Sequence, residues 1–204
     1  MYKRQTLDII FTAEDEVLNG FAVPANYTII WVDQNDAALW TGDEKWLRTV
    51  LAHELQHLVY FNTVKGPWWL PEPMNSLVHG TPAWIVEGIA EYFTEEWRPF
   101  RYELSHRYHV LRNTVHKIQD PHNDGYSKSL YLADRFGDST ISKILNHRNK
   151  LKFLDFKESF KKHTGITLKQ FNEDWRRQMN TFYFSQRSQK ERLEDAGAIR
   201  KLPI

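Results

Sequence analysis

The sequence predicts an α+β fold, in which a small N-terminal mixed sheet is followed by a mainly helical domain. Short runs of β-branched and aromatic residues occur before residue 33, and apolar residues recur at helical spacing from about residue 43 onward. Strands that come before helices, instead of alternating with them, are typical of α+β domains. Hydrophobic residues make up 41% of the 204 residues, which is enough to fill a core.

Three strands are predicted, at residues 7–11, 21–23 and 27–32. The third has the strongest signal because it is rich in β-branched and aromatic residues. Asn19-Gly20 is a turn signal that precedes the second strand. We therefore expect the sheet to be complete before the first long helix begins.

The helices are predicted from apolar periodicity and capping residues. The first covers about 46–61, with Thr41 or Asp43 as its N-cap, and Asp43 and Glu44 suit its positive end. Later helices are predicted at 82–97, 102–118, 126–137, 139–149, 153–163 and 168–182. We expect one domain over 1–182, and a charged C-terminal helix or tail over 183–204 that could also be a linker to a further domain.

The pentapeptide HELQH at residues 53–57 carries the clearest chemistry of the chain. On a helix, His53 and His57 lie one turn apart on the same face, so both imidazoles can reach one Zn²⁺. Glu54 would then lie beside the open position of the metal. The alternative is a pair of ordinary surface or core histidines.

A third metal ligand is expected from the predicted helix at 82–97. Glu87 and Glu91 share one face of that helix, and Gly88 would allow another helix to approach closely. We expect Glu87 to bind the metal and Glu91 to accept the free ring N–H of His53. The alternative is a solvated acidic face, which fits poorly because apolar residues surround the two carboxylates. These neighbours are Trp84, Ile85, Ile89, Tyr92 and Phe93.

The pentapeptide followed by residues 84–92 resembles the gluzincin metallopeptidases, and more narrowly the bacterial peptidase MA-like domains related to thermolysin and M1 aminopeptidases. The resemblance extends over about residues 5–180 and implies a zincin-type domain with a peptide or protein substrate. It also suggests a periplasmic or secreted protein. Residues 125–137 are similar to the helix that carries a transition-state tyrosine in M1 enzymes, which maps onto Tyr126. Tyr131 is the fallback for this role.

Two departures from the M1 pattern limit what the resemblance implies. The interval between His57 and Glu87 is longer, and it includes a proline- and tryptophan-rich stretch at 66–73 that could overhang the cleft. The segment that binds the substrate amine in M1 aminopeptidases is absent, so aminopeptidase specificity is not implied. In relatives an edge strand binds extended peptide, and residues 29–33 would be the local equivalent.

Composition limits the partners and the chemistry. The net charge of +1 gives no electrostatic case for nucleic acid or a membrane, and no apolar run is long enough for a membrane span. We also expect no signal peptide at the start of this chain. The absence of cysteine excludes disulfides and a Cys-ligated zinc. Oligomeric state cannot be read from this sequence.

Other candidate residues form weaker patterns. His106 and His109 are either a second metal site or solvated or structural histidines, and Trp68-Trp69 either line a substrate pocket or are core or loop-anchoring residues. The remaining histidines form no ligand pattern: His79, His116, His122, His147 and His163.

The function predicted from the residues is a zinc-dependent peptidase, with Zn²⁺ held by His53, His57 and Glu87. Glu54 would be the general base, and Tyr126 would stabilise the oxyanion. The main alternative is a catalytically silent zincin-like domain that binds peptide or protein. A helical domain with a fortuitous pentapeptide and a zinc hydrolase of non-peptide amides also remain open.

Overall fold

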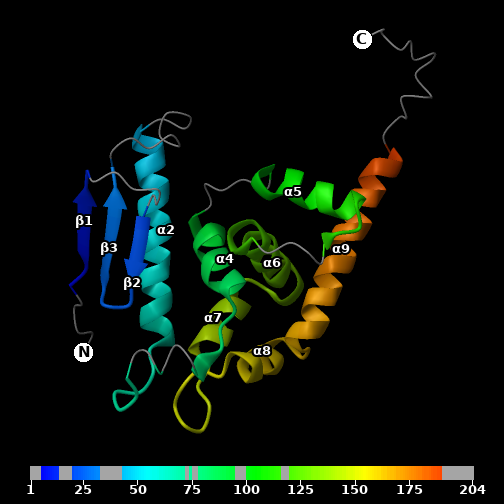
Figure 1. The fold of residues 1–204 in the computed structure, drawn as a ribbon. Coiled ribbons are helices and arrows are strands. Elements are labelled where there is room, and N and C mark those ends of the chain that lie inside the picture. Colours follow the sequence, from blue (N-terminus) through cyan, green and yellow to red (C-terminus); the bar gives the residue numbers. More distant parts are fainter. Residues whose placement is uncertain are drawn as a thin grey trace.

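The computed structural model describes residues 6–13, 20–32, 43–71, 74, 78–94, 100–115 and 120–189 of the chain. Its elements are β1 (Asp8–Thr12), β2 (Gly20–Val23), β3 (Tyr27–Trp31), α2 (Asp43–Val64), α4 (Ala83–Thr94), α5 (Phe100–Leu111), α6 (Pro121–Phe136), α7 (Ser139–Asn146), α8 (Phe156–Thr164) and α9 (Leu168–Gln189). Figure 1 shows the sheet and α2 along one side of the molecule, with the later helices beside them. The predicted α+β class with a small N-terminal mixed sheet is confirmed.

The three strands lie in the order β1-β3-β2. β1 runs parallel to β3, and β2 runs antiparallel to β3 after a turn in which Asn26 adopts a left-handed φ of 65°. The expectation that residues 29–33 form an edge strand is therefore wrong for 29–31, because β3 is hydrogen-bonded on both sides. Residue 33 lies outside the described residues. β2 occupies the edge of the sheet that is nearer to α2 in Figure 1.

One face of the sheet packs on α2. Thr28 and Ile30 alternate along β3 and are both buried, as expected for a strand with one covered face. Ile30 forms a small apolar cluster with Trp46 and Val50 from the first half of α2. This cluster holds the sheet against α2 and so brings β2 alongside the HELQH segment.

The larger core lies among the later helices, where α4 and α6 pack closely. Gly88 on α4 lies against Gly125 on α6, and an ideal Cβ at Gly88 would be only 2.3 Å from the Gly125 carbonyl oxygen. The predicted role of Gly88 in close helix packing is borne out by this contact. The aromatic centre of the core includes Phe156, Phe160 and Phe171, all fully buried.

Several helix boundaries differ from the predictions; for example, α5 ends at Leu111 and not at residue 118, and α7 ends at Asn146 and not at residue 149. α6 begins at Pro121 and not at residue 126, because the Asp120 carboxylate caps the backbone N–H groups of His122 and Asn123. α9 continues to Gln189, so the expected boundary at 182 falls inside a helix. The predicted N-cap Thr41 and residues 190–204 lie outside the described part of the chain. None of the described helices has the length and apolarity needed to cross a membrane.

Candidate metal centre

The two histidines of the HELQH segment converge near the middle of α2. His53 and His57 are both buried, and their Nε2 atoms are 3.1 Å apart. Their rings meet edge to face, with centroids 4.7 Å apart. One helical turn between the residues gives this convergence, as the sequence predicted.

Glu87 approaches both imidazoles from α4. Its Oε2 atom lies 3.2 Å from His57 Nε2 and 3.5 Å from His53 Nε2. Gly88, the next residue, faces α6 through the glycine contact, which leaves Glu87 on the side of α4 that meets α2. The structure thus brings together the three residues that the sequence predicted as ligands.

The spacing of these three atoms fits one tetrahedral ion. Zinc binds histidine nitrogen and carboxylate oxygen at about 2.0–2.2 Å, so two tetrahedral ligand atoms should be about 3.3–3.5 Å apart. The observed separations are 3.1, 3.2 and 3.5 Å. The donor set of two imidazoles and one carboxylate also suits Zn²⁺.

The electrostatics keep Glu87 in the form that binds a cation. Burial alone would raise the pKa of Glu87, but hydrogen bonds with His53 and His57, together with the nearby His122, hold that pKa well below its usual range. The ion pairs of Glu87 within the described residues are all with imidazoles. Among the residues that the structure describes, no lysine or arginine pairs with this carboxylate, so its negative charge is available to a metal.

Glu54 lies between the histidines and the edge strand β2. Its side chain is buried, and an ideal Cβ on Gly20 would come within 2.7 Å of Glu54 Oε1. Burial raises the pKa of Glu54, while His57, His53 and a backbone hydrogen bond from Ala22 lower it in part. Only glycine at position 20 leaves room for this carboxylate beside the strand.

His122 belongs to the same cluster, although the sequence analysis found no ligand pattern for it. Its Nδ1 lies 2.9 Å from Glu91 Oε1 and 3.6 Å from Glu87 Oε2. Its ring stacks on His53 with centroids 5.6 Å apart, and its side chain is 44% exposed. The sequence feature that could have pointed to His122 is the Asp120-Pro121 pair, because it starts α6 early enough to put His122 in the first turn.

Glu91 is buried and lies closer to His122 than to His53. Its Oε1 is 3.9 Å from His53 Nδ1, longer than a hydrogen bond, so the expected Glu91–His53 hydrogen bond is not formed in this structure. Glu91, His53 and His122 make up a second group of side chains whose ligand atoms lie within 4.8 Å of one another. Glu91 therefore lies between His53 and His122.

Tyr126 lies one turn after His122 on α6. Its ring centroid is 6.5 Å from that of Tyr92, and burial together with the charge of Glu91 raises its pKa. Its role at an oxyanion stays a prediction. The fallback Tyr131 is buried in the core, where its hydroxyl accepts a hydrogen bond from Arg135 and its ring packs on Phe171.

The remaining sequence candidates lie elsewhere. His106 contacts Ser127, and His109 contacts Thr114, so this pair does not converge on one point. The metal-ligand groups within the described residues include neither of them. The described residues 65–71 extend beyond the C-terminal end of α2, as Figure 1 shows, instead of lying along it.

Comparisons with protein-family models, with curated proteins and with solved structures give no match for this chain. The resemblance to gluzincins therefore rests on the residues quoted above.

Proposed function

We propose that this chain is a zinc-dependent peptidase of the gluzincin type. The observation that carries the proposal is the set of separations among His53 Nε2, His57 Nε2 and Glu87 Oε2, which are 3.1, 3.5 and 3.2 Å. These values lie within about 0.2 Å of the edges expected for a tetrahedral zinc site, which has one position left for water or substrate. Zn²⁺ held there would polarise a carbonyl and lower the pKa of a coordinated water.

Glu54 is the proposed general base. Its carboxylate is buried and interacts electrostatically with His53, His57 and Glu87, which supports a role beside the ligand set. It would accept a proton from the attacking water as the new C–O bond forms. It would then deliver that proton to the amide nitrogen as the C–N bond breaks.

The edge strand beside Glu54 supports a peptide substrate over a non-peptide amide. β2 pairs with β3 on one side only within the described sheet, and Gly20 and Ala22 both lie next to the Glu54 side chain. An extended peptide can add to such an edge through main-chain hydrogen bonds. Its scissile bond would then pass close to Glu54.

His122 is the proposed substrate contact on the α6 side of the ligand set. Glu91 holds its Nδ1 at 2.9 Å, and 44% of the His122 side chain is exposed beside the ligand histidine His53. A group that is both fixed and accessible can orient a bound peptide. Tyr126 remains the proposed oxyanion donor, and a Tyr126→Phe variant compared with His122→Ala separates the two roles.

Metal analysis tests the site directly. We expect about one zinc per chain in protein purified without chelator, lost in His57→Ala and in Glu87→Ala. Matched controls are His109→Ala and Glu173→Ala, which change the same residue types outside the cluster and should keep the metal. Wild-type protein that neither contains zinc nor takes it up on reconstitution would rule out the proposed function.

Peptide-library cleavage then separates the peptidase from the silent binding module. We expect cleavage that needs zinc. A zinc-loaded protein that binds library peptides without cutting any of them would instead favour the module.

A further inference from the structure

Two ordered turns project from one end of the molecule. In the first, the Leu70 N–H donates to the Pro67 carbonyl at 2.9 Å, which closes a β-turn. Trp68 and Trp69 occupy the two central positions of this turn and are 97% and 52% exposed. The backbone hydrogen bond therefore presents both indoles to solvent.

The second turn follows α7. Asn149 organises it, because its Oδ1 accepts from the N–H groups of Leu151 and Phe153, and its carbonyl accepts from Lys152 N–H. The tip of this turn carries Lys150, Leu151 and Lys152, all exposed, and Leu151 is 63% exposed. One apolar side chain thus stands between two lysines.

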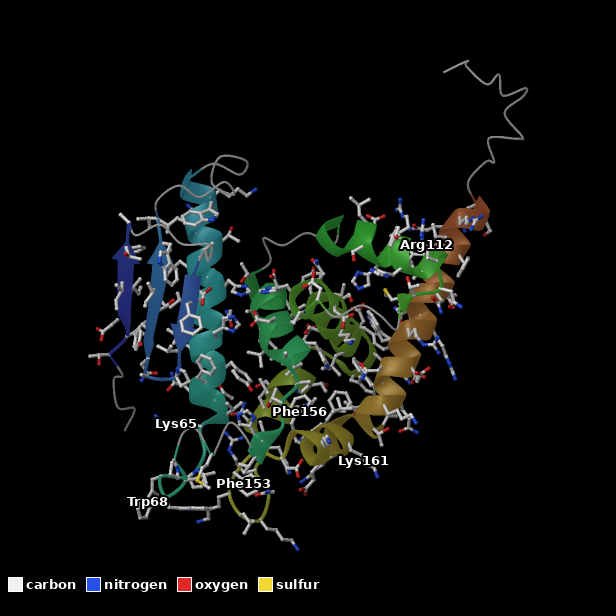
Figure 2. The ribbon with its side chains drawn as sticks, in the orientation of Figure 1. Lys65, Trp68, Arg112, Phe153, Phe156 and Lys161 are labelled. Atoms are coloured by element: carbon white, nitrogen blue, oxygen red, sulfur yellow. The ribbon has the colours of Figure 1, made fainter. Side chains whose placement is uncertain are left out.

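The bases of the two turns are joined. Arg148, at the start of the second turn, donates to the carbonyl of Thr63 in the last turn of α2, and the first turn begins directly after α2. Figure 2 shows Lys65, Trp68 and Phe153 at the same end of the molecule, far from Arg112. We define the Trp–Lys tip as Lys65, Trp68, Trp69, Lys150, Leu151 and Lys152.

The composition of the Trp–Lys tip differs from that of the whole chain. The net charge is +1 over 204 residues, but the described residues 65–71 and 147–154 contain no carboxylate. Glu72 lies outside the described residues. An exposed apolar patch, unlike a single exposed apolar side chain, often marks a contact with a partner. Trp68 is also not packed on the core, so its exposure supports neither the pocket-wall nor the core role.

We propose that the Trp–Lys tip docks on the interface of a membrane that contains anionic lipids. Tryptophan prefers the boundary between headgroups and acyl chains, and lysines at the same depth attract phosphate groups. The projecting shape and single sign of charge favour a lipid surface over a protein groove. The docking leaves β2 and the metal centre outside the membrane, because the tip lies beyond the end of α2.

Vesicle binding tests this proposal with the full chain. We expect the protein to sediment with vesicles of phosphatidylcholine and phosphatidylglycerol, but not with phosphatidylcholine alone, and to be released by high salt. Tryptophan emission should be quenched by lipids brominated on their acyl chains. The doubly substituted Trp68→Ala/Trp69→Ala protein should lose most of the binding and this quenching.

The lysines are tested separately. Lys150→Gln/Lys152→Gln should weaken binding about 30-fold, since each lysine near an anionic surface contributes about 1 kcal/mol. The matched control is Arg112→Gln/Arg187→Gln, which removes two exposed charges outside the tip and should leave binding unchanged. All four positions of the two pairs are exposed, so the variants should fold normally.

Three outcomes would overturn the proposal. The first is no sedimentation with anionic vesicles at millimolar lipid. The second is equal weakening by the tip pair and the control pair. The third is self-association that is lost in Trp68→Ala/Trp69→Ala without any vesicle binding, which would assign the Trp–Lys tip to a protein contact.

Discussion

Two clusters on the helices of this protein contain the same kinds of residues but differ in what they can do. The first is the candidate metal centre, called the metal centre below, whose residues come from α2, α4 and α6. A second set, which we name the His106 network, consists of His106, Asp124, Ser127, Lys128 and Trp175 and joins α5, α6 and α9. Histidine and carboxylate occur in both, and α6 contributes to both.

The His106 network resembles a catalytic triad only in composition. Ser127 Oγ and Asp124 Oδ1 approach the same nitrogen of His106, Nε2, at 3.2 and 3.9 Å. A triad needs the serine on one ring nitrogen and the carboxylate on the other. His106 is 0% exposed, so no substrate can reach it. The network is therefore a structural element of the core.

The two clusters differ in charge balance as well as in their accessibility to substrate. Lys128 Nζ lies 2.6 Å from Asp124 Oδ2 and also stands over the rings of Trp84 and Trp175. The negative charge in the network thus has its own cation. Glu87 has only imidazoles as described partners, so a cation from solution can complete the metal centre. Composition alone would not have distinguished these two cases.

The largest expected difference between the clusters is in catalysis. Glu54→Gln should lower peptide cleavage about 100- to 10,000-fold while the zinc content stays near that of the wild type. Ser127→Ala should leave the specific activity of folded protein within about a factor of two of wild type. Steady-state assays at matched zinc content measure both. Comparable losses in the two variants would remove the distinction between the clusters.

The next largest effect is on stability. Lys128→Met should lower the free energy of unfolding by about 3–5 kcal/mol, because it leaves the Asp124 carboxylate buried without its cation. Urea unfolding monitored by circular dichroism measures the change. The surface variant Arg176→Met, which removes an exposed ion pair with Glu173, should cost less than about 1 kcal/mol. A loss below 1 kcal/mol in Lys128→Met would show that the network contributes little.

Removal of metal should affect one cluster only. Zinc present at 100 times its dissociation constant stabilises the folded state by about 2.7 kcal/mol, so chelation should lower Tm by about 5–11 °C. His57→Ala should melt at the same temperature with and without chelator, whereas Ser127→Ala should respond like the wild type. Scanning calorimetry makes the comparison. A chelator effect of equal size in His57→Ala would place the metal elsewhere.

The smallest expected effect comes from two helix caps. Asp120→Ala and Asp155→Ala each remove an N-cap carboxylate and should each cost about 1 kcal/mol of stability. Only Asp120→Ala should also lower peptidase activity, because the Asp120 cap fixes the turn of α6 that carries His122. Parallel melting curves and activity assays compare them. If both variants lost activity equally, the position of His122 would not depend on its cap.

The predictable part of the site is the part encoded locally. His53 and His57 share one helix, so their separation follows from helical geometry alone, and Glu87 was identified from its apolar, glycine-containing helix. His122 was missed because its approach to Glu91 depends on how α4 packs on α6. The Asp120-Pro121 pair, which the helix predicted from residue 126 did not take into account, puts His122 in a first turn but does not show which helix it faces.

In the fold, too, local features could be predicted from the sequence, whereas features that depend on tertiary packing could not. The strands and the α+β class followed from short-range patterns, whereas the order β1-β3-β2 required knowledge of which strands pair. The apolar and β-branched residues of β3 predict a strand, but they do not show whether that strand lies at the centre or at the edge of the sheet. The edge position of β2 beside Glu54 emerges only in three dimensions.

The glycine contact between α4 and α6 makes the spacing between Glu91 and His122 a property of the backbone. Gly88 and Gly125 meet main chain to main chain, and an ideal Cβ on Gly125 would be 2.2 Å from the Trp84 carbonyl oxygen. Because the contact is between backbone atoms, a change of side-chain rotamer does not alter the distance between α4 and α6 at this point. Glu87, Glu91 and His122 are therefore carried by two helices whose separation is set by direct backbone contact.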